Sequence, residues 1–263
     1  MRFVLFFLFF VLASGVPAGV SHAEGRTDAF SRAPSSDDVD VGEAYVATNF
    51  KELIQSMVLM SGLDINDNAI ADEYSKILYC DLYEKNFTND FEWNNIRRQI
   101  VSRVLEKRET YRLNYEIFSV IKLERYDFEN QFFPLTADTK MVKVGTMIVY
   151  DRRADYVPYC GQSLPSPLLP PIIQLGLSQP LTFDKFKIPM DEAEDLIDSF
   201  ERLKITDRQL YARVRTRLNF MGEIAKDKGN AMRATIRAEI KSIDLFLDKE
   251  MTMFVKNIVL SKH

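Results

Sequence analysis

Three arginines late in the chain have the spacing of a ligand-binding surface. Arg213, Arg215 and Arg217 stand at every second position, so an extended strand would present their guanidinium groups on one face, and Tyr211 extends the row. Guanidinium groups hold carboxylates and phosphates through paired hydrogen bonds. This arginine row therefore predicts a site for an anionic glycan, a lipid head group or an acidic peptide. The alternative is a polar sheet face in which an acid such as Glu239 pairs with the row across the strands.

Two other groups of side chains are candidates for binding. Aromatic residues gather near a predicted sheet edge, where they either contact sugars or a partner, or pack into the core: Tyr126, Phe128, Phe132 and Phe133. Basic residues recur on a predicted helix, where they either face an acidic partner or form a solvated helix face: Arg97, Arg98, Arg103, Lys107 and Arg108. The sequence leaves these alternatives open for both groups.

The scarcity of histidine argues against most hydrolytic chemistry. The chain has 2 histidines, of which His22 falls in a predicted leader and His263 stands at the C-terminus. Serine and cysteine nucleophile pairs and catalytic zinc sites need an imidazole held rigidly beside its partner, which a terminal residue is poorly placed to provide. We therefore expect neither a histidine-dependent hydrolase nor a histidine-bound metal.

The spacing of glycines and acids argues against nucleotide and calcium binding. After the leader, no two glycines stand close enough to form a phosphate-binding loop. The segment from Asp64 to Asn68 offers alternating oxygen ligands, but the glycine and the final acid of a calcium loop are missing. This segment therefore predicts a helix cap. We expect no cofactor and no metal.

Once histidine-dependent and nucleotide-binding sites are excluded, carboxylates are the remaining candidates for catalytic side chains. A pair of Asp or Glu side chains can cleave glycosidic bonds whatever their separation in the sequence. Four acids lie near predicted strands, although a solvated surface is the usual place for such residues: Glu116, Glu124, Asp127 and Glu129. A carboxylate-dependent hydrolase of envelope polysaccharide is therefore the alternative to a binding function.

The N-terminal segment has the features of a signal peptide. Arg2 precedes an unbroken apolar run over residues 3–12, and the small residues that end at Ala23 suit signal peptidase. The apolar run is about half the length needed to cross a membrane, which disfavours a retained anchor. Residues 1–23 therefore predict export to the periplasm or outside the cell.

The cysteines fit such a destination. Cys80 and Cys160 are the 2 cysteines of the chain, and in an oxidising compartment we expect them to form a disulfide. The alternative is two separate buried thiols, because the sequence does not reveal the distance between them.

Charge and hydropathy narrow the class of partner. The formal charge is -4, from 34 basic and 38 acidic residues, which argues against nucleic acid as a partner. The longest apolar stretch after the leader, residues 168–177, is interrupted by Pro170 and Pro171. We therefore expect that the exported chain is not an integral membrane protein.

The periodicity of apolar residues predicts helices before strands. Residues 24–42 are small, polar and acidic and predict a flexible tether, so one folded domain is expected over 43–263. A period near 3.6 predicts helices over 43–61, 70–82, 89–105 and 190–203. Alternation predicts strands over 111–117, 142–148, 182–188, 210–220 and 235–246, with a hairpin turn over 226–230. Four prolines over 164–171 predict a rigid extended connector. We expect an α+β fold with a mainly antiparallel sheet.

Four short motifs are distributed along the predicted domain: Tyr79-Cys80, the run from Asn89 to Trp93, Tyr126-Asp127-Phe128, and Ile188-Pro189 ahead of a late helix. Together they resemble a family of exported bacterial proteins known as a domain of unknown function. The resemblance implies secretion and a similar fold, and it brings no catalytic or binding residue with it.

These features together predict an exported binding or assembly module rather than an enzyme. Its partner is expected to be an anionic envelope component or another exported protein. The two candidate functions differ in one structural respect. A hydrolase needs a cleft with two carboxyl groups about 5 to 9.5 Å apart, whereas a binding module exposes the arginine row or the aromatic cluster.

Overall fold

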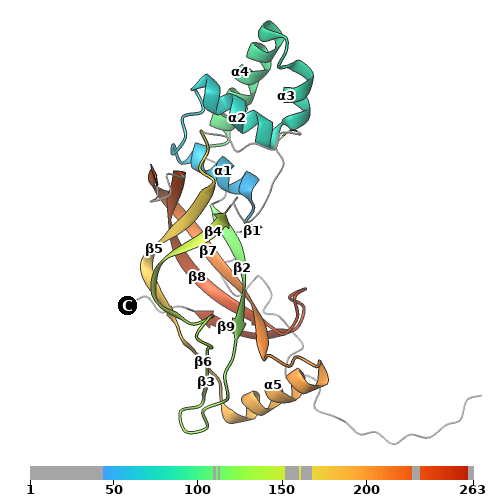
Figure 1. Ribbon diagram of the computed structural model, residues 1–263, viewed down its shortest axis with the longest axis vertical. Coiled ribbons are helices and arrows are strands. Elements are labelled where there is room, and N and C mark those ends of the chain that lie inside the picture. Colours follow the sequence, from blue (N-terminus) through green and yellow to red (C-terminus); the bar gives the residue numbers. More distant parts are fainter. Residues whose placement is uncertain are drawn as a thin grey trace, which may run out of the picture.

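The computed structural model confirms the expected α+β fold. It describes residues 44–108, 111, 113–151, 160, 168–226 and 232–259. The predicted leader and tether, part of the predicted connector and most of the predicted hairpin turn lie outside these residues. The first four helices gather at one end of the molecule, next to a long twisted sheet, and a later helix lies at the opposite end (Figure 1).

The helices at the first end form what we call the helical head. They are α1 (Phe50–Leu59), α2 (Asn68–Leu78), α3 (Cys80–Asn86) and α4 (Asp90–Glu106). Three of them begin after a residue whose side chain accepts a backbone N–H of the first turn: Asn49, Asp67 and Asn89. Asp67 confirms the helix cap predicted within 64–68.

Two of the helix predictions are corrected by the structure. The first helix starts at Phe50 rather than near residue 43, because the short strand β1 (Val46–Ala47) precedes it and pairs with the sheet. The helix predicted over 70–82 is divided into α2 and α3, because Tyr79 leaves the helical conformation with φ -132° and ψ 43°. Cys80 therefore opens α3 instead of lying late in one longer helix.

The main sheet has seven strands in the order β1, β2, β7, β8, β5, β4, with β9 also paired to β8. Their bounds are β2 (Asn114–Lys122), β4 (Met141–Asp151), β5 (Ile172–Phe183), β7 (Gln209–Lys226), β8 (Met232–Phe246) and β9 (Phe254–Val259). The pairs β1–β2 and β5–β8 are parallel, and the other four pairs are antiparallel. The expectation of a mainly antiparallel sheet is confirmed.

Strand β8 is the centre of this sheet because it has three partners. One edge pairs with β7 along most of its length. The other edge is shared, since residues 233–238 pair with β5 and residues 242–246 pair with β9. The second half of β8 is also buried on both faces, since the consecutive residues Ser242, Ile243 and Asp244 are at most 1% exposed.

The largest difference from the sequence-based expectation is β5, a central strand that was not predicted. Its first six residues are all buried or half-buried, so they lack the exposed positions typical of a strand with one solvated face. The segment predicted as one strand over 182–188 contains the end of β5 and the short β6 (Lys185–Lys187). Strand β6 pairs with β3 (Phe132–Pro134) in a separate two-stranded sheet.

Helix α5 (Met190–Arg202) closes the end of the molecule opposite the head (Figure 1). Pro189 precedes it, in agreement with the prediction of a helix over 190–203. Its buried residues are Ala193, Leu196, Ser199 and Phe200, and the acidic side chains between them face outward.

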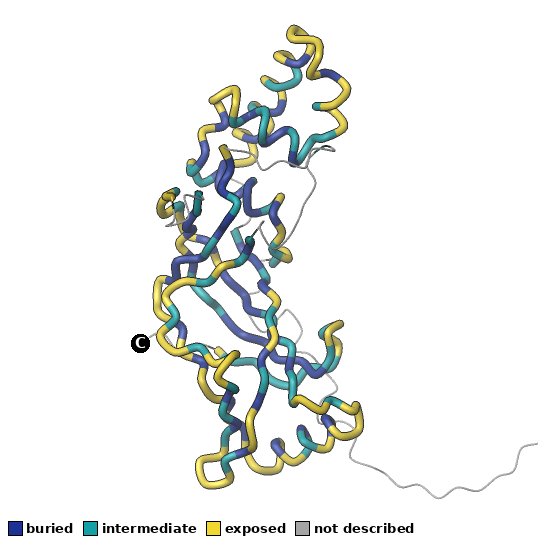
Figure 2. Tube along the Cα trace, viewed as in Figure 1, coloured by how far each residue is buried: buried dark blue, intermediate teal, exposed yellow. Residues whose placement is uncertain are grey.

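A buried hydroxyl network joins the head to the sheet. Ser56 of α1 lies 2.6 Å from the Tyr115 hydroxyl of β2, and the Tyr111 hydroxyl donates a 2.6 Å hydrogen bond to Glu52. Burial and the hydrogen bond to Glu52 raise the pKa of Tyr111 well above its usual value. Buried residues run continuously from α1 into the sheet (Figure 2), so the base of the head and the sheet share one core.

No helix within the described ranges is long and apolar enough to span a membrane.

Candidate functional site

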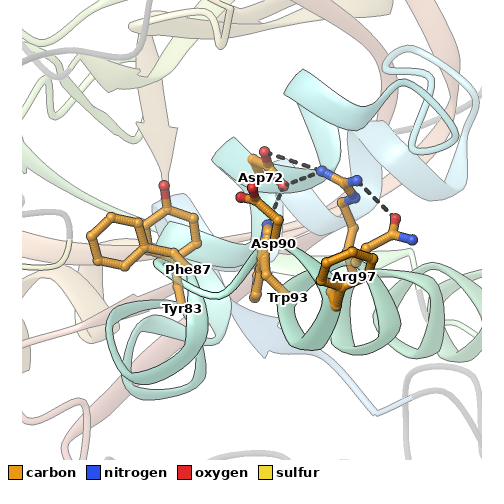
Figure 3. Close-up of a pocket in the computed structure, with 8 residues that line it drawn as sticks. Asp72, Tyr83, Phe87, Asp90, Trp93 and Arg97 are labelled. Atoms are coloured by element: carbon orange, nitrogen blue, oxygen red, sulfur yellow. Dashed lines mark hydrogen bonds and ion pairs between the residues drawn. The ribbon is translucent and has the colours of Figure 1, made fainter.

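The helical head contains a pocket of about 510 Å³, which we call the head pocket (Figure 3). Its volume lies within the range of small-molecule and side-chain binding sites. Its lining combines aromatic rings with carboxylates, an amide and a guanidinium: Asp72, Tyr83, Phe87, Asp90, Phe91, Trp93, Asn94 and Arg97.

Three helices bring these residues together. Asp72 comes from α2, Tyr83 lies on α3, and Phe87 is the residue that ends α3, one helical turn after Tyr83. The remaining residues belong to α4, where the spacing of three, four and seven residues places most of them on one face: Asp90, Trp93, Asn94 and Arg97. The packing of α2, α3 and α4 therefore builds the pocket.

The polar side of the pocket is fixed by Asp72. Its carboxylate accepts a 2.9 Å hydrogen bond from the indole nitrogen of Trp93 and 3.1 and 3.3 Å hydrogen bonds from Arg97. The other terminal nitrogen of Arg97 donates a 3.0 Å hydrogen bond to the side chain of Asn94. These four residues hold one another in place, and the charges of Asp72 and Arg97 offset each other.

Aromatic rings form the apolar side of the pocket. Tyr83 and Phe87 are stacked with their ring centroids 5.2 Å apart, and Trp93 meets Tyr83 edge-on at 5.0 Å. Phe91 and Phe87 are exposed, at 88% and 46%. Large exposed rings beside a pocket are a feature of binding surfaces, because each ring offers apolar area that a ligand can cover.

The predicted disulfide between Cys80 and Cys160 is confirmed, with their α-carbons 5.2 Å apart. Cys80 is the first residue of α3, so the bond ties the helix that carries Tyr83 and ends at Phe87 to a distant part of the chain. Glu84 lies close to the two sulfur atoms. This cluster is no metal site, because both thiols are used in the disulfide.

The arginine row lies on β7, where carboxylates from the neighbouring strands meet it. Arg213 donates 2.9 and 3.2 Å hydrogen bonds to Asp244 of β8, and Arg215 donates a 3.4 Å hydrogen bond to Glu116 of β2. Asp244 is fully buried and accepts a further 2.5 Å hydrogen bond from Asn257 of β9. Two arginines and two carboxylates thus form one internally compensated network.

The remaining members of the row differ from this pair. Arg217 is exposed and stands opposite Glu239 in the β7–β8 register, as the alternative reading of the sequence anticipated. Tyr211 lines a second hollow of about 530 Å³ near the end of α5, and none of the three arginines belongs to that lining. Binding of an anionic ligand by Tyr211 and the row stays a prediction.

The predicted aromatic cluster is divided between core and surface. Phe133 and Tyr126 are buried, and the Tyr126 hydroxyl donates a 2.8 Å hydrogen bond to the Ile188 carbonyl. Phe132 is half-buried beside Lys185, and only Phe128 is largely exposed, at 66%. The cluster mainly fixes the end of the molecule near α5, as its core-packing alternative implies.

None of the four carboxylates considered as catalytic candidates lines the head pocket or the hollow beside Tyr211. Glu116 pairs with Arg215, and Asp127 accepts 3.0 and 2.9 Å hydrogen bonds from the backbone and side chain of Asn130. Those hydrogen bonds from Asn130 lower the pKa of Asp127 below its usual value. Glu124 and Glu129 are exposed.

The basic residues predicted on the third helix also have different roles. Arg97 lines the head pocket, whereas Arg98 hydrogen-bonds to Asn95 and Arg108 donates to the Leu59 carbonyl at 2.9 Å. Arg103 and Lys107 are exposed. These residues do not form a single cationic face.

Sequence reasoning missed the pocket residues of α2 and α3. The spacing of Asp90, Trp93 and Arg97 on one helix face was a readable signal, but a helix alone does not reveal what faces it. Asp72 and Tyr83 join the site only through the packing of three helices, which the sequence pattern does not specify.

Comparison with known proteins identifies one family. Residues 66–198 match the family described as Domain of unknown function (DUF4852). The matched segment contains every residue that lines the head pocket, both cysteines and all the motifs that carried the resemblance. No curated protein and no solved structure is significantly similar to the chain.

Proposed function

We propose that this chain, which belongs to the DUF4852 family of domains of unknown function, is an exported binding module that holds its ligand in the head pocket. The observation that carries the proposal is the preformed pocket itself. Exposed Phe87 and Phe91 stand beside a polar group that is already fixed by Asp72, Trp93 and Arg97. A site that is ordered before the ligand arrives loses less entropy on binding.

Two features support export. Residues 1–23 have the composition of a cleavable leader. The Cys80–Cys160 disulfide is typical of proteins that fold in an oxidising compartment. An exported chain of this kind would meet envelope components or other exported proteins as its ligands.

Two features favour binding over catalysis. The histidines stand at positions 22 and 263, far in sequence from the pocket residues. The Asp72 carboxylate is engaged by three hydrogen bonds from Trp93 and Arg97, so it is held for structure rather than placed for proton transfer.

The proposal is tested through the fluorescence of Trp93, the only tryptophan of the chain. The chain without its leader is titrated with four ligand classes: organic cations, organic anions, neutral oligosaccharides and short peptides. We expect at least one class to change the emission of Trp93 saturably, because the indole lies in the pocket lining.

The matched variants are Phe91→Ala and Phe128→Ala. Both remove a largely exposed ring, at 88% and 66%, but only Phe91 lines the head pocket. We expect Phe91→Ala to weaken binding about tenfold, in line with the loss of one ring contact, and Phe128→Ala to leave it unchanged. No saturable response to any class, or equal effects of both variants, would contradict the proposal.

A hydrolase is the second candidate, because the pocket lining includes two carboxylates, Asp72 and Asp90, next to aromatic rings. This candidate predicts that the chain releases new reducing ends from envelope polysaccharide. It further predicts that Asp72→Asn and Asp90→Asn each abolish the release. Unchanged polysaccharide after prolonged incubation would favour the binding function.

A further inference from the structure

We infer that the head pocket binds an alkylammonium group, from a lysine side chain or from a quaternary ammonium compound. This inference rests on the proposed function and adds the chemical class of the ligand. Its basis is the position of exposed aromatic rings next to a carboxylate that no described residue neutralises.

The charges of the pocket favour a cation. Arg97 lies 3.1 Å from Asp72, so these two groups offset each other. Asp90 is exposed on the first turn of α4, and within the described ranges no lysine or arginine forms an ion pair with it. The pocket lining therefore has one uncompensated negative charge, which attracts a cation and repels an anion.

The aromatic rings favour a cation as well. The face of an aromatic ring is electronegative, and ammonium groups bind to it within about 6 Å of the ring centroid. The head already contains one such contact, since the Lys76 ammonium lies 5.2 Å from the centroid of Tyr83. One face of Phe87 stacks on Tyr83, but Phe87 and Phe91 line the same pocket and remain exposed to solvent, so part of each ring is open to a ligand.

The hydrogen bonds of the pocket make other ligands less suitable. Asp72, Asn94 and Arg97 already bond to one another, which leaves few of their polar atoms for the hydroxyls of a sugar. The N-terminus of α4, which would otherwise suit an anion, is capped by Asn89 and has Asp90 and Glu92 in its first turn. An alkylammonium group needs only the ring faces and one carboxylate.

The test uses three probes. Choline is compared with 3,3-dimethyl-1-butanol, which has the same shape but no charge. The third probe is a lysine amide that is acetylated on its α-amino group and keeps a free side-chain ammonium. Binding is followed by the emission of Trp93. We expect a saturable response to choline, to the lysine amide or to both, and none to the neutral alcohol. The response should weaken as the salt concentration rises.

The two charged probes also separate the sources of the ligand. A response to the lysine amide alone identifies a peptide side chain, whereas a response to choline alone identifies a quaternary ammonium compound. Equal responses to choline and the neutral alcohol, or no response to either charged probe, would overturn the inference. If another ligand class changes Trp93 emission in that case, the proposed function stands and only the cation assignment fails.

Variants distinguish the pocket carboxylate from general surface charge. Asp90→Asn removes the uncompensated charge with little change in shape, and we expect it to weaken binding of the charged probe about tenfold. Asp81→Asn is the matched control, because Asp81 is an exposed first-turn acid of α3 that does not line the pocket. Equal affinities of the two variants would overturn the role of Asp90, provided that their thermal midpoints confirm that both are folded.

Discussion

At the scale of single residues, Asp244 depends most strongly on its neighbours. Asp244 is completely buried, with 0% of its surface exposed. Its carboxylate accepts hydrogen bonds from Arg213 and Asn257. A buried charge of this kind is tolerated only while its partners remain, because removal from water is costly.

We therefore expect Arg213→Gln to lower the free energy of unfolding by about 3 kcal/mol. This value is the lower end for breaking a buried ion pair, because Arg215 remains 3.6 Å from Asp244. Arg217→Gln is the control from the exposed end of the row and should cost about 0.5 kcal/mol. Equilibrium denaturation with urea measures both. Similar losses for the two variants would show that the network around Asp244 contributes little.

Because Arg217→Gln should fold normally, it is also the suitable variant for the untested prediction of an anionic ligand at the arginine row. Unchanged retention of that variant on an anionic envelope fraction would count against the prediction.

The arginine row illustrates how far single residues can be interpreted from sequence. Its period placed Arg213, Arg215 and Arg217 on one strand, and Glu239 was correctly placed on the neighbouring strand. The partners of the first two arginines, Glu116 and Asp244, come from strands on both sides of β7. Which residues face each other depends on strand register, and register is determined by packing that the sequence of one strand does not contain.

At the scale of elements, β7 and β8 approach each other closely at Gly222. A β-carbon added there would lie 2.9 Å from the backbone oxygen of Thr235, which cannot move aside as a side chain can. By contrast, nothing lies within 4 Å of the corresponding position at Gly145 on β4. The two glycines form a natural pair for measuring the close approach.

We expect Gly222→Ala to lower the free energy of unfolding by about 1 to 3 kcal/mol, the usual cost of forcing atoms into a filled space. Gly145→Ala should be neutral or stabilising by less than about 1 kcal/mol, because alanine restricts the unfolded chain. Thermal unfolding followed by circular dichroism compares them. A destabilised Gly145→Ala together with a neutral Gly222→Ala would contradict the register of β7 and β8.

Elements with a local signal were predicted well. Helix α4 has a cap residue and a clear period, and β7 and β8 alternate over long stretches, so their positions followed from the sequence. Strand β5 was missed because its first six residues are buried or half-buried, which removes the exposed positions that mark a strand with one solvated face. The head pocket was missed for a related reason, since it depends on how helices pack rather than on any one of them.

At the scale of the whole molecule, the disulfide connects the head with a residue 80 positions later in the chain. A crosslink over such a loop restricts the unfolded state and contributes about 4 kcal/mol in the chain-entropy model. Cys80 also begins α3, so the crosslink anchors the helix that carries Tyr83 and leads directly into Phe87, two aromatic residues of the head pocket.

Replacing both cysteines with serine should therefore lower the free energy of unfolding by up to about 4 kcal/mol. It should also shift the emission of Trp93 to longer wavelengths, because the indole would become more accessible to water. Adding a thiol reductant to the unaltered chain should reproduce both effects, and the same reductant should leave the double variant unchanged. An unaltered midpoint after full reduction would indicate that the head keeps its structure without the crosslink.

The position of β2 in the sheet has a consequence for how the chain acquires its structure. On one edge, β2 pairs with β7, for example Asn114 with Arg217, so every element from β3 to α5 is synthesised before this long antiparallel partner. On the other edge of β2, β1 pairs with only Tyr115 and Glu116. Closing so large a loop slows folding, whereas the helices of the head form from nearby residues. During that interval the unpaired edge of β2 can accept a strand from another unfinished copy. Rapid folding of this protein thus depends on keeping newly made chains apart until β7 has arrived.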